Sequence, residues 1–171
     1  MDALHARAST KPSTLAQADQ YLTFQLDGQD YGIEILRVQE IKRWEKPTRL
    51  PHSPDHVQGV INLRGAVVPI LDLRRRFGLG ESGYAAGAIV IVVGIDNELG
   101  GLTAGVVVDA VCEVCSIDPA DLRPAPELGS AFDGAFVRGL VVIEERMLIL
   151  LDVAQLVNTM LGESATTPKV A

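Results

Sequence analysis

The sequence is poor in aromatic residues and in positive charge. Phe, Tyr and Trp together make up 5% of its 171 residues, and Trp44 is the single tryptophan. The formal net charge is −7 at pH 7. Proteins that bind single-stranded nucleic acid use aromatic stacking and basic grooves, and anionic membrane surfaces attract basic proteins. The composition therefore argues against general binding to nucleic acid or to a membrane surface.

Long hydrophobic runs are also missing. The longest apolar stretch, residues 85–95, has eleven residues and includes two glycines. A helix needs about 20 apolar residues to cross a bilayer. The N-terminal residues lack the apolar region that a signal peptide requires. We expect the chain to remain in the cytoplasm.

Cysteine and histidine are scarce. Cys112 and Cys115 form a C-x-x-C, but in a strand a spacing of three places the two side chains on opposite faces. No second cysteine pair follows. His52 and His56 are four residues apart, and neighbouring prolines disfavour the helix that would stack them. We expect ordinary core or surface cysteines, no metal site and no cofactor.

Sequence signatures of catalysis are missing as well. There is no Gly-x-Ser-x-Gly nucleophile turn and no Gly-x-x-x-x-Gly-Lys phosphate loop. The glycines of residues 94–105 lie between expected strands, and none of them opens a helix. The adjacent carboxylates Glu144 and Glu145 fall in an expected hairpin turn, where such side chains usually face water. A binding protein is therefore favoured over an enzyme.

Aliphatic residues are abundant, and they predict a mainly β fold. Hydrophobic residues make up 47% of the chain, and β-branched side chains favour strands. Asp27-Gly28 and Arg64-Gly65 are predicted hairpin turns. Asp72 and Asp152 stand where two helices are expected to begin. The first helix should end at Phe77 and the second at about Leu161. The predicted strands are residues 21–26, 31–35, 38–44, 59–63, 66–71, 88–95, 102–108, 111–117, 137–143 and 147–151.

The chain contains an internal repeat. When Gly59 is placed on Gly139, the next fourteen residues align without gaps at an offset of 80, with apolar residues matched in both strands and Leu-Asp matched before each helix, and residues 38–41 align with 111–114 at an offset of 73. Two copies of a five-strand unit are predicted, at about 20–85 and 86–161. Closing so short a sheet into a barrel removes its exposed edges. We expect two small SH3-like barrels that share apolar surface, between a disordered leader (1–19) and a disordered tail (162–171).

Charge is distributed unevenly along the chain. Residues 34–76 carry nine Lys and Arg against five Asp and Glu, whereas the rest carries six against seventeen. A basic face on an acidic body suits a polar protein partner. Within this segment, Glu40 lies in a strand otherwise lined with apolar residues, and Arg64 lies at a hairpin tip. The forked donors of Arg64 could bind the carboxylate of Glu40 or that of a partner. The alternative is that Arg64 is an ordinary turn arginine that faces solvent.

Several motifs in order resemble one known family. They are residues 31–41 (YGIEILRVQEI), 59–65 (GVINLRG) and 68–74 (VPILDLR), followed by 107–111 (VVDAV) and 147–152 (MLILLD). This pattern is similar to the CheW family of chemotaxis coupling proteins over residues 20–161. The resemblance implies one CheW-like domain of two intertwined five-stranded SH3-like barrels, with short helices and a C-terminal helix.

The resemblance also implies a function. Family members are non-catalytic adaptors that join the cytoplasmic tips of methyl-accepting chemotaxis receptors to the regulatory domain of the histidine kinase CheA, at membrane-associated arrays. The positions that match the family's receptor-binding residues are Val38, Glu40, Gly59, Arg64, Gly65, Val107 and Val108. The positions that match its kinase-binding residues are Ile35, Val38 and Glu40. Two alternatives stay open: a coupling protein of a non-motility chemosensory pathway, and a small β-barrel that binds nucleic acid through the basic segment.

Overall fold

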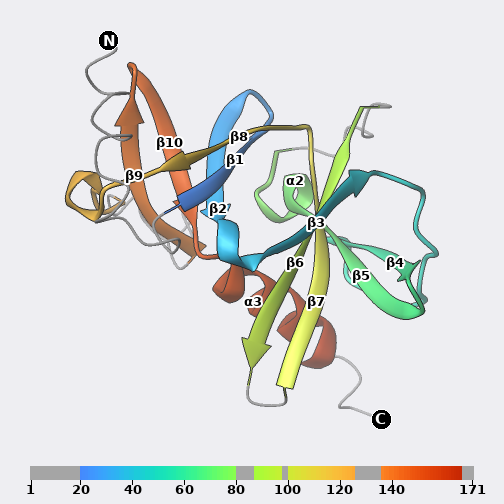
Figure 1. Ribbon diagram of the computed structural model, residues 1–171. Helices are drawn as coiled ribbons and strands as arrows, with labels where there is room; N and C mark the ends of the chain where they lie inside the picture. The colour runs from blue at the N-terminus through green and yellow to red at the C-terminus, as the bar shows by residue number, and fades with distance from the viewer. Residues whose placement is uncertain (1–19, 80–86, 98–99, 126–135, 167–171) are drawn as a thin grey trace.

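Two five-stranded sheets lie side by side in the computed structural model, which describes residues 20–79, 87–97, 100–125 and 136–166 (Figure 1). The expected leader and residues 167–171 lie outside these ranges. One sheet, which we call the β1 sheet, has the order β8-β1-β2-β10-β9, and the other, the β3 sheet, has the order β3-β6-β7-β5-β4. The strands are β1 (Gln20–Leu26), β2 (Gln29–Glu34), β3 (Val38–Arg43), β4 (Val57–Leu63), β5 (Ala66–Asp72), β6 (Ile89–Asn97), β7 (Gly100–Val108), β8 (Ala110–Ser116), β9 (Val137–Ile143) and β10 (Arg146–Leu151).

The repeat predicted from the sequence is also a structural repeat. β4 pairs with β5 and β9 with β10 in the same register, so that Ile61↔Val68 matches Val141↔Leu148 at the offset of 80. Each unit also has a single bridge from the loop that precedes its hairpin, Thr48↔Val60 in one and Arg123↔Leu140 in the other. Chance similarity between Val-rich strands does not produce matched pairing of this kind.

The sheets nevertheless do not coincide with the two repeated units. The hairpin β1–β2 of the first unit joins β8, β9 and β10 of the second, and the hairpin β6–β7 of the second unit joins β3, β4 and β5 of the first. The expected division near residue 85 therefore separates repeats and not barrels. The cause is parallel pairing of β2 with β10 and of β5 with β7, which gives each unit's hairpin to the other unit's sheet.

Turns and helix starts follow local sequence chemistry. Asp27 and Gly28 both have positive φ, at 54° and 80°, as the tight turn of a two-residue hairpin requires. A carboxylate oxygen of Asp72 accepts the Arg75 N–H at 3.2 Å at the start of α2 (Leu73–Arg76). The equivalent Asp152 accepts the Gln155 N–H at 3.1 Å at the start of α3 (Val153–Thr166). Both predicted N-caps are confirmed.

Helix α3 is longer than the sequence indicated. It continues past Leu161 to Thr166, so residues 162–166 are helical and do not belong to an irregular tail. Gly162 costs a helix only about 1 kcal/mol, and the buried Leu156, Val157 and Met160 hold the preceding turns in place. Among the described residues, no helix is both long enough and apolar enough to cross a membrane.

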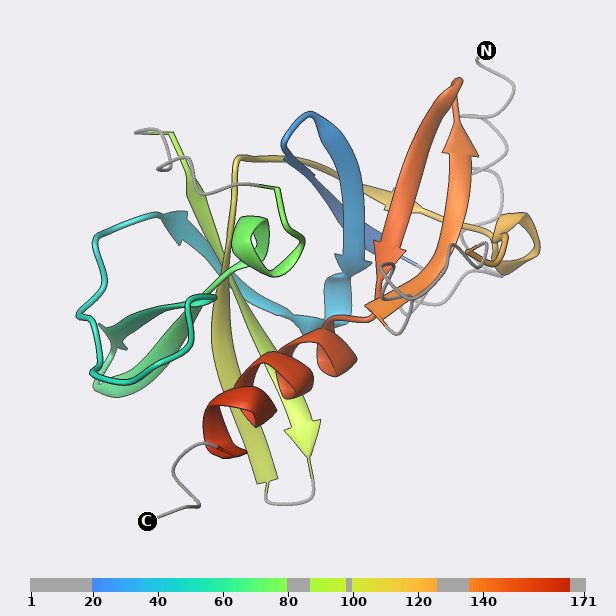
Figure 2. The ribbon, with the colours of Figure 1, turned by 180° about the vertical axis from the view of Figure 1, so that it is seen from behind.

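One hydrophobic core extends through both sheets. It includes Phe24 and Ile33 of the β1 sheet, Ile91 and Val106 of the β3 sheet, and Val157 of α3. Helix α3 follows β10 but crosses over β6 and β7 of the other sheet (Figure 2). Helix α2 makes the reciprocal contact, because the ring of its C-terminal neighbour Phe77 packs at a tilt against Tyr31 of β2, with 5.7 Å between ring centroids. Each unit therefore buries its helix against its own hairpin, which lies in the other unit's sheet.

Gly59 is predicted to contribute strongly to the stability of the fold. It has φ 145°, and a Cβ atom at this position would collide with the carbonyl of Thr48. Replacing Gly59 by Ala should lower the free energy of unfolding by about 2–4 kcal/mol, because neither backbone can move aside cheaply. Urea denaturation measures this loss.

Gly28→Ala is the matched control. Gly28 also has positive φ, 80°, but open space surrounds the Cβ position. Only conformational strain applies there, so the expected loss is about 1 kcal/mol. Equal losses for the two variants would mean that the contact with Thr48 does not constrain the fold.

Candidate functional site

Arg64 and Glu40 form an exposed ion pair on the β3 sheet. Arg64 is the first residue of the β4–β5 turn, with φ 52°, and its Nη2 lies 2.7 Å from Oε1 of Glu40 on β3. The Arg64 side chain is 73% exposed. Exposed pairs of this kind stabilise a fold by less than about 1 kcal/mol. The pair therefore orients a guanidinium toward solvent and contributes little to stability.

The two glycines of the expected site have different roles. Gly65 completes the turn with φ 89°, and its N–H donates to Oδ1 of Asn62 at 2.8 Å. It lies at the exposed tip beside Arg64. Gly59 is buried beneath the Thr48 segment, where it permits close approach of two backbones. Gly65 is available to a partner, whereas Gly59 supports the surface from within.

Val107 and Val108 do not reach the surface. Both side chains of these β7 residues are 0% exposed, and they pack in the hydrophobic core. In this structure they cannot line a groove with their side chains. Strand alternation alone would have placed one of them outward, but β7 is covered on both faces. Val108 packs in the core that includes Val157 of α3, and Val107 packs on the opposite face in a separate cluster with Ile70 and Val90.

The connection between the sheets exposes an apolar residue that sequence patterns did not mark. Ile35 and Val38 are half-buried against the shared core, while Leu36, in the short 3₁₀ helix η2 (Ile35–Arg37), is 60% exposed. The 3₁₀ turn breaks the strand alternation on which the prediction of residues 31–35 rested. No periodic signal identifies Leu36 for this reason.

The η2 connection is held by a carboxylate. Glu34, at the end of β2, lies 2.8 Å from Nη1 of Arg138 on β9 and 3.6 Å from Nε of Arg37. Its side chain is 17% exposed, so the pairing with Arg138 is partly shielded from water. These contacts give Ile35, Leu36 and the start of β3 a defined position.

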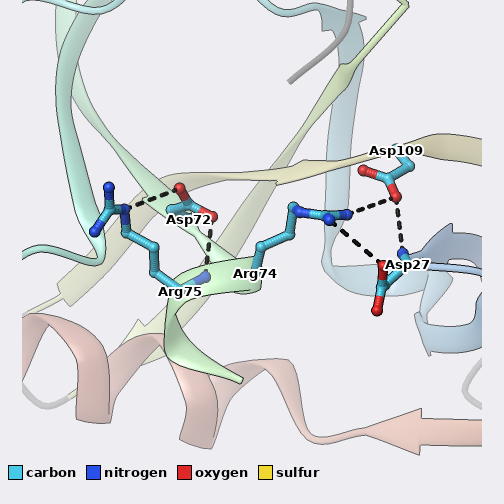
Figure 3. Close-up of polar contacts among 5 residues, drawn as sticks. All are labelled: Asp27, Asp72, Arg74, Arg75 and Asp109. Carbon is cyan, nitrogen blue, oxygen red and sulfur yellow. Dashed lines mark hydrogen bonds and ion pairs between the residues drawn. The ribbon is translucent and has the colours of Figure 1, made fainter. Parts of the chain in front are cut away.

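A second polar cluster lies where α2 meets the β1–β2 turn (Figure 3). The Arg74 guanidinium contacts Oδ2 of Asp109 at 3.0 Å and Oδ1 of Asp27 at 3.4 Å, and the Arg74 side chain is 12% exposed. Beside it, Nε of Arg75 lies 3.8 Å from Oδ2 of Asp72. The sequence did not predict the contacts of Arg74 with Asp27 and Asp109, because no spacing rule connects positions so far apart in the chain.

Comparison with known proteins identifies the family. The family model described as the CheW-like domain matches residues 20–160. The chain belongs to the CheW family.

Relatives and a solved structure agree with this assignment. The chemotaxis protein CheW of Klebsiella aerogenes is 40% identical over 140 residues, which cover 82% of each chain. The probable chemotaxis protein CheW of Rhizobium etli is 35% identical over 153 residues, covering 89% of this chain and 96% of the relative. The crystal structure of the scaffolding protein TtCheW from Thermoanaerobacter tengcongensis matches with a TM-score of 0.70 and 35% identity, over 80% of this chain and 85% of that one. This CheW-family chain functions in chemotaxis signal transduction, as its motifs predicted.

The two repeats of this CheW-family chain differ in charge at their hairpin tips. Arg64 and Gly65 of the β4–β5 turn correspond to Glu144 and Glu145 of the β9–β10 turn, and Arg64 and Glu144 have the same φ of 52°. Glu40 corresponds to Glu113 of β8 at the offset of 73. The second repeat thus has like charges where the first has an ion pair. The Arg64 tip is chemically distinct from its structural counterpart.

The two cysteines lie in different environments. Cys112 is exposed, Cys115 is half-buried, and both are free thiols. Burial raises the pKa of the Cys115 thiol to about 11, with a further contribution from Glu113. Within residues 20–79, 87–97, 100–125 and 136–166, no group of three or more His, Cys, Asp or Glu side chains is placed to hold a metal ion.

The two thiols should differ in reactivity. At pH 8 we expect iodoacetamide to modify Cys112 first, because it is exposed, and to leave Cys115 largely unmodified, because its high pKa keeps the thiolate rare. Between pH 7 and 9 the rate at Cys115 should rise by about tenfold per pH unit, as expected well below its pKa. Peptide mass spectrometry distinguishes the two sites. Equal labelling in the folded protein would contradict the burial of Cys115.

Proposed function

We propose that this chain is a non-catalytic adaptor that couples the cytoplasmic tips of methyl-accepting chemoreceptors to the regulatory domain of a CheA-type histidine kinase. The observation that carries the proposal is the exposed Arg64–Glu40 pair at the tip of one hairpin of a CheW-like double barrel. The pair stabilises the fold little, it is absent from the equivalent position of the second repeat, and it presents free guanidinium donors.

The proposed receptor surface consists of Val38, Glu40, Arg64 and Gly65. Arg64 offers forked donors to a carboxylate or carbonyl of the receptor, and Glu40 limits the directions in which the guanidinium points. Exposed apolar area lies nearby on the same hairpin, because Val67 is 72% exposed. The remaining predicted residues, Gly59, Val107 and Val108, act from beneath by shaping β4 and β7.

The proposed kinase surface lies around the η2 connection. Ile35, Val38 and Glu40 belong to it, and Leu36 is the side chain there that is most available to a partner, at 60% exposure. An aliphatic side chain on a backbone held by the Glu34–Arg138 pair loses little conformational entropy on binding. Such residues serve as anchors when the partner offers an apolar pocket.

The mechanism requires binding and no chemical step. By holding both partners, the adaptor raises the effective concentration of the kinase at the receptor tip. A change in the receptor can then shift the kinase equilibrium only through contacts that differ between the two states. We place the protein in the cytoplasm, recruited to membrane-associated receptor arrays.

Two other functions predicted from the sequence remain as alternatives. A non-motility chemosensory pathway would use the same two surfaces with different receptors. Nucleic-acid binding would require a basic groove with aromatic platforms. Trp44 does not provide one, because it is partly buried and packs against the cluster that includes Ala88 and Val90.

Arg64→Ala should weaken receptor binding selectively. We expect the affinity for a receptor cytoplasmic fragment to fall by at least about tenfold. The affinity for the kinase regulatory domain should be retained. The melting temperature should change by less than about 3 °C, because the residue is exposed. Isothermal titration calorimetry with each partner and a thermal melt measure these effects.

Arg146→Ala is the matched control for this variant. Arg146 begins β10, its side chain is 61% exposed, and its Nη2 also lies 2.7 Å from a carboxylate, that of Asp30. It should bind the receptor fragment as the wild type does. Equal weakening in both variants, or unfolding of Arg64→Ala, would show that Arg64 has no specific role at the receptor.

Leu36→Asp should weaken kinase binding and spare receptor binding. A charged side chain at the centre of an apolar contact must be desolvated, which we expect to reduce kinase affinity by about tenfold or more. Val142→Asp is the control, since Val142 on β9 is also 50% exposed but lies away from η2. Loss of kinase binding in the control alone would move the kinase surface to the β9–β10 hairpin.

A further inference from the structure

A single residue connects the two sheets at one of their two chain crossings. β7 of the β3 sheet ends at Val108, β8 of the β1 sheet begins at Ala110, and Asp109 alone lies between them. The other crossing uses the three residues of η2. Rotations between packed parts of a protein are absorbed by a few residues in such connections. The backbone angles of Asp109 therefore affect how the two sheets are oriented.

Asp109 is held by three hydrogen bonds. Its N–H donates to the carbonyl of Gln25 at 3.0 Å, which ties the connection to β1. Its Oδ2 accepts from Nη1 of Arg74 at 3.0 Å and from the N–H of Asp27 at 2.8 Å (Figure 3). Both the backbone and the side chain of this one residue are thereby fixed.

The partners of Asp109 come from both sheets. Asp27 lies in the turn between β1 and β2, and Arg74 lies in α2, directly after β5 of the β3 sheet. Arg74 also reaches Oδ1 of Asp27 at 3.4 Å, so one guanidinium joins the turn of one sheet to the helix of the other. At 12% exposure this guanidinium is mostly shielded from water, which makes its contacts stronger than those of a surface pair.

The hydrophobic core does not by itself define this orientation. Apolar contacts such as those between Phe24 and its neighbours hold the sheets together, but hydrophobic attraction is not directional. A forked guanidinium between two carboxylates has a narrow range of acceptable geometries. Directional control therefore falls to the polar cluster at the crossing.

We propose that Asp109 is a hinge between the two barrels and that Arg74 is the positioning residue that locks it. The lock keeps the two barrels moving as one body. An adaptor whose barrels move together can transmit a receptor shift to the kinase, and this consequence rests on the proposed function. The hinge does not depend on that function, and it can be tested on the protein alone.

The test measures the distance between the barrels by double electron–electron resonance. Spin labels are placed at Val67→Cys on β5 and Met147→Cys on β10, which are exposed and structurally equivalent positions, with Cys112 and Cys115 replaced by Ser. In this background Arg74→Met, which retains bulk but removes the charge, should broaden the distance distribution and add a shifted population. The parent protein should give one narrow distribution.

Arg75→Met is the matched control, because Arg75 is the next residue of α2 and its Nε faces Asp72 of the same sheet. It should leave the distribution narrow. Hydrogen exchange at the Asp27 amide adds a second readout, since this amide donates to Asp109 and should exchange faster only in Arg74→Met. An unchanged distribution in Arg74→Met, or equal broadening in Arg75→Met, would overturn the proposal.

Asp109→Asn keeps the test decisive if Arg74→Met fails to fold. The amide oxygen still accepts the Asp27 N–H, but the charge that attracts Arg74 is gone. We expect an intermediate broadening of the same distance distribution. A distribution identical to that of the parent would mean that the Arg74–Asp109 contact does not set the orientation of the barrels.

Discussion

The structure depends on two parallel strand pairs, β2 with β10 and β5 with β7. Each pair joins strands from different repeats, so neither repeat can complete its sheet alone. Glycine occurs at the matching position of each pair: a Cβ on Gly32 would lie 2.9 Å from Cδ2 of Leu150, and one on Gly105 would lie 2.8 Å from Cδ1 of Ile70. The close approach that builds the shared core is therefore repeated along with the strands.

This exchange explains where the two proposed binding surfaces lie. The chain must cross between the sheets, and η2 and Asp109 are the two crossings. Leu36 is exposed because a short 3₁₀ turn, and not a strand, carries the chain across. The Arg64 tip projects from a hairpin that lies entirely within one repeat, so its geometry is set locally by the turn and by Glu40. Of the two proposed surfaces, the Arg64 tip thus belongs to one repeat, whereas the exposed Leu36 results from the exchange of hairpins between the sheets.

Duplication also clarifies the role of charge. The backbone of the Arg64–Gly65 turn is repeated at Glu144–Glu145, while the side-chain chemistry is reversed. The same scaffold therefore presents a cation at one end and acids at the other. The family's fold supplies the hairpin, and the individual residues at its tip decide which partner it suits.

Features controlled by near neighbours in the chain were predictable. The Asp27-Gly28 turn and the caps at Asp72 and Asp152 follow from φ preferences and short hydrogen bonds. The sequence offered the contact of Arg64 with Glu40 as one of several options, and the fold brings together these two residues 24 positions apart. The repeat and the family motifs were equally visible. The end of α3 was not, because packing of its buried face outweighed the local stop signal at Gly162.

The sequence by itself determined the strands, the turns, the helix starts, the repeat and the family. Only the tertiary structure decided which hairpin joined which sheet, that Val107 and Val108 are buried, and that Arg74 lies between Asp27 and Asp109. Asp27 and Asp109 are 82 residues apart. Such contacts form only after both sheets assemble around one core, and no local propensity specifies them.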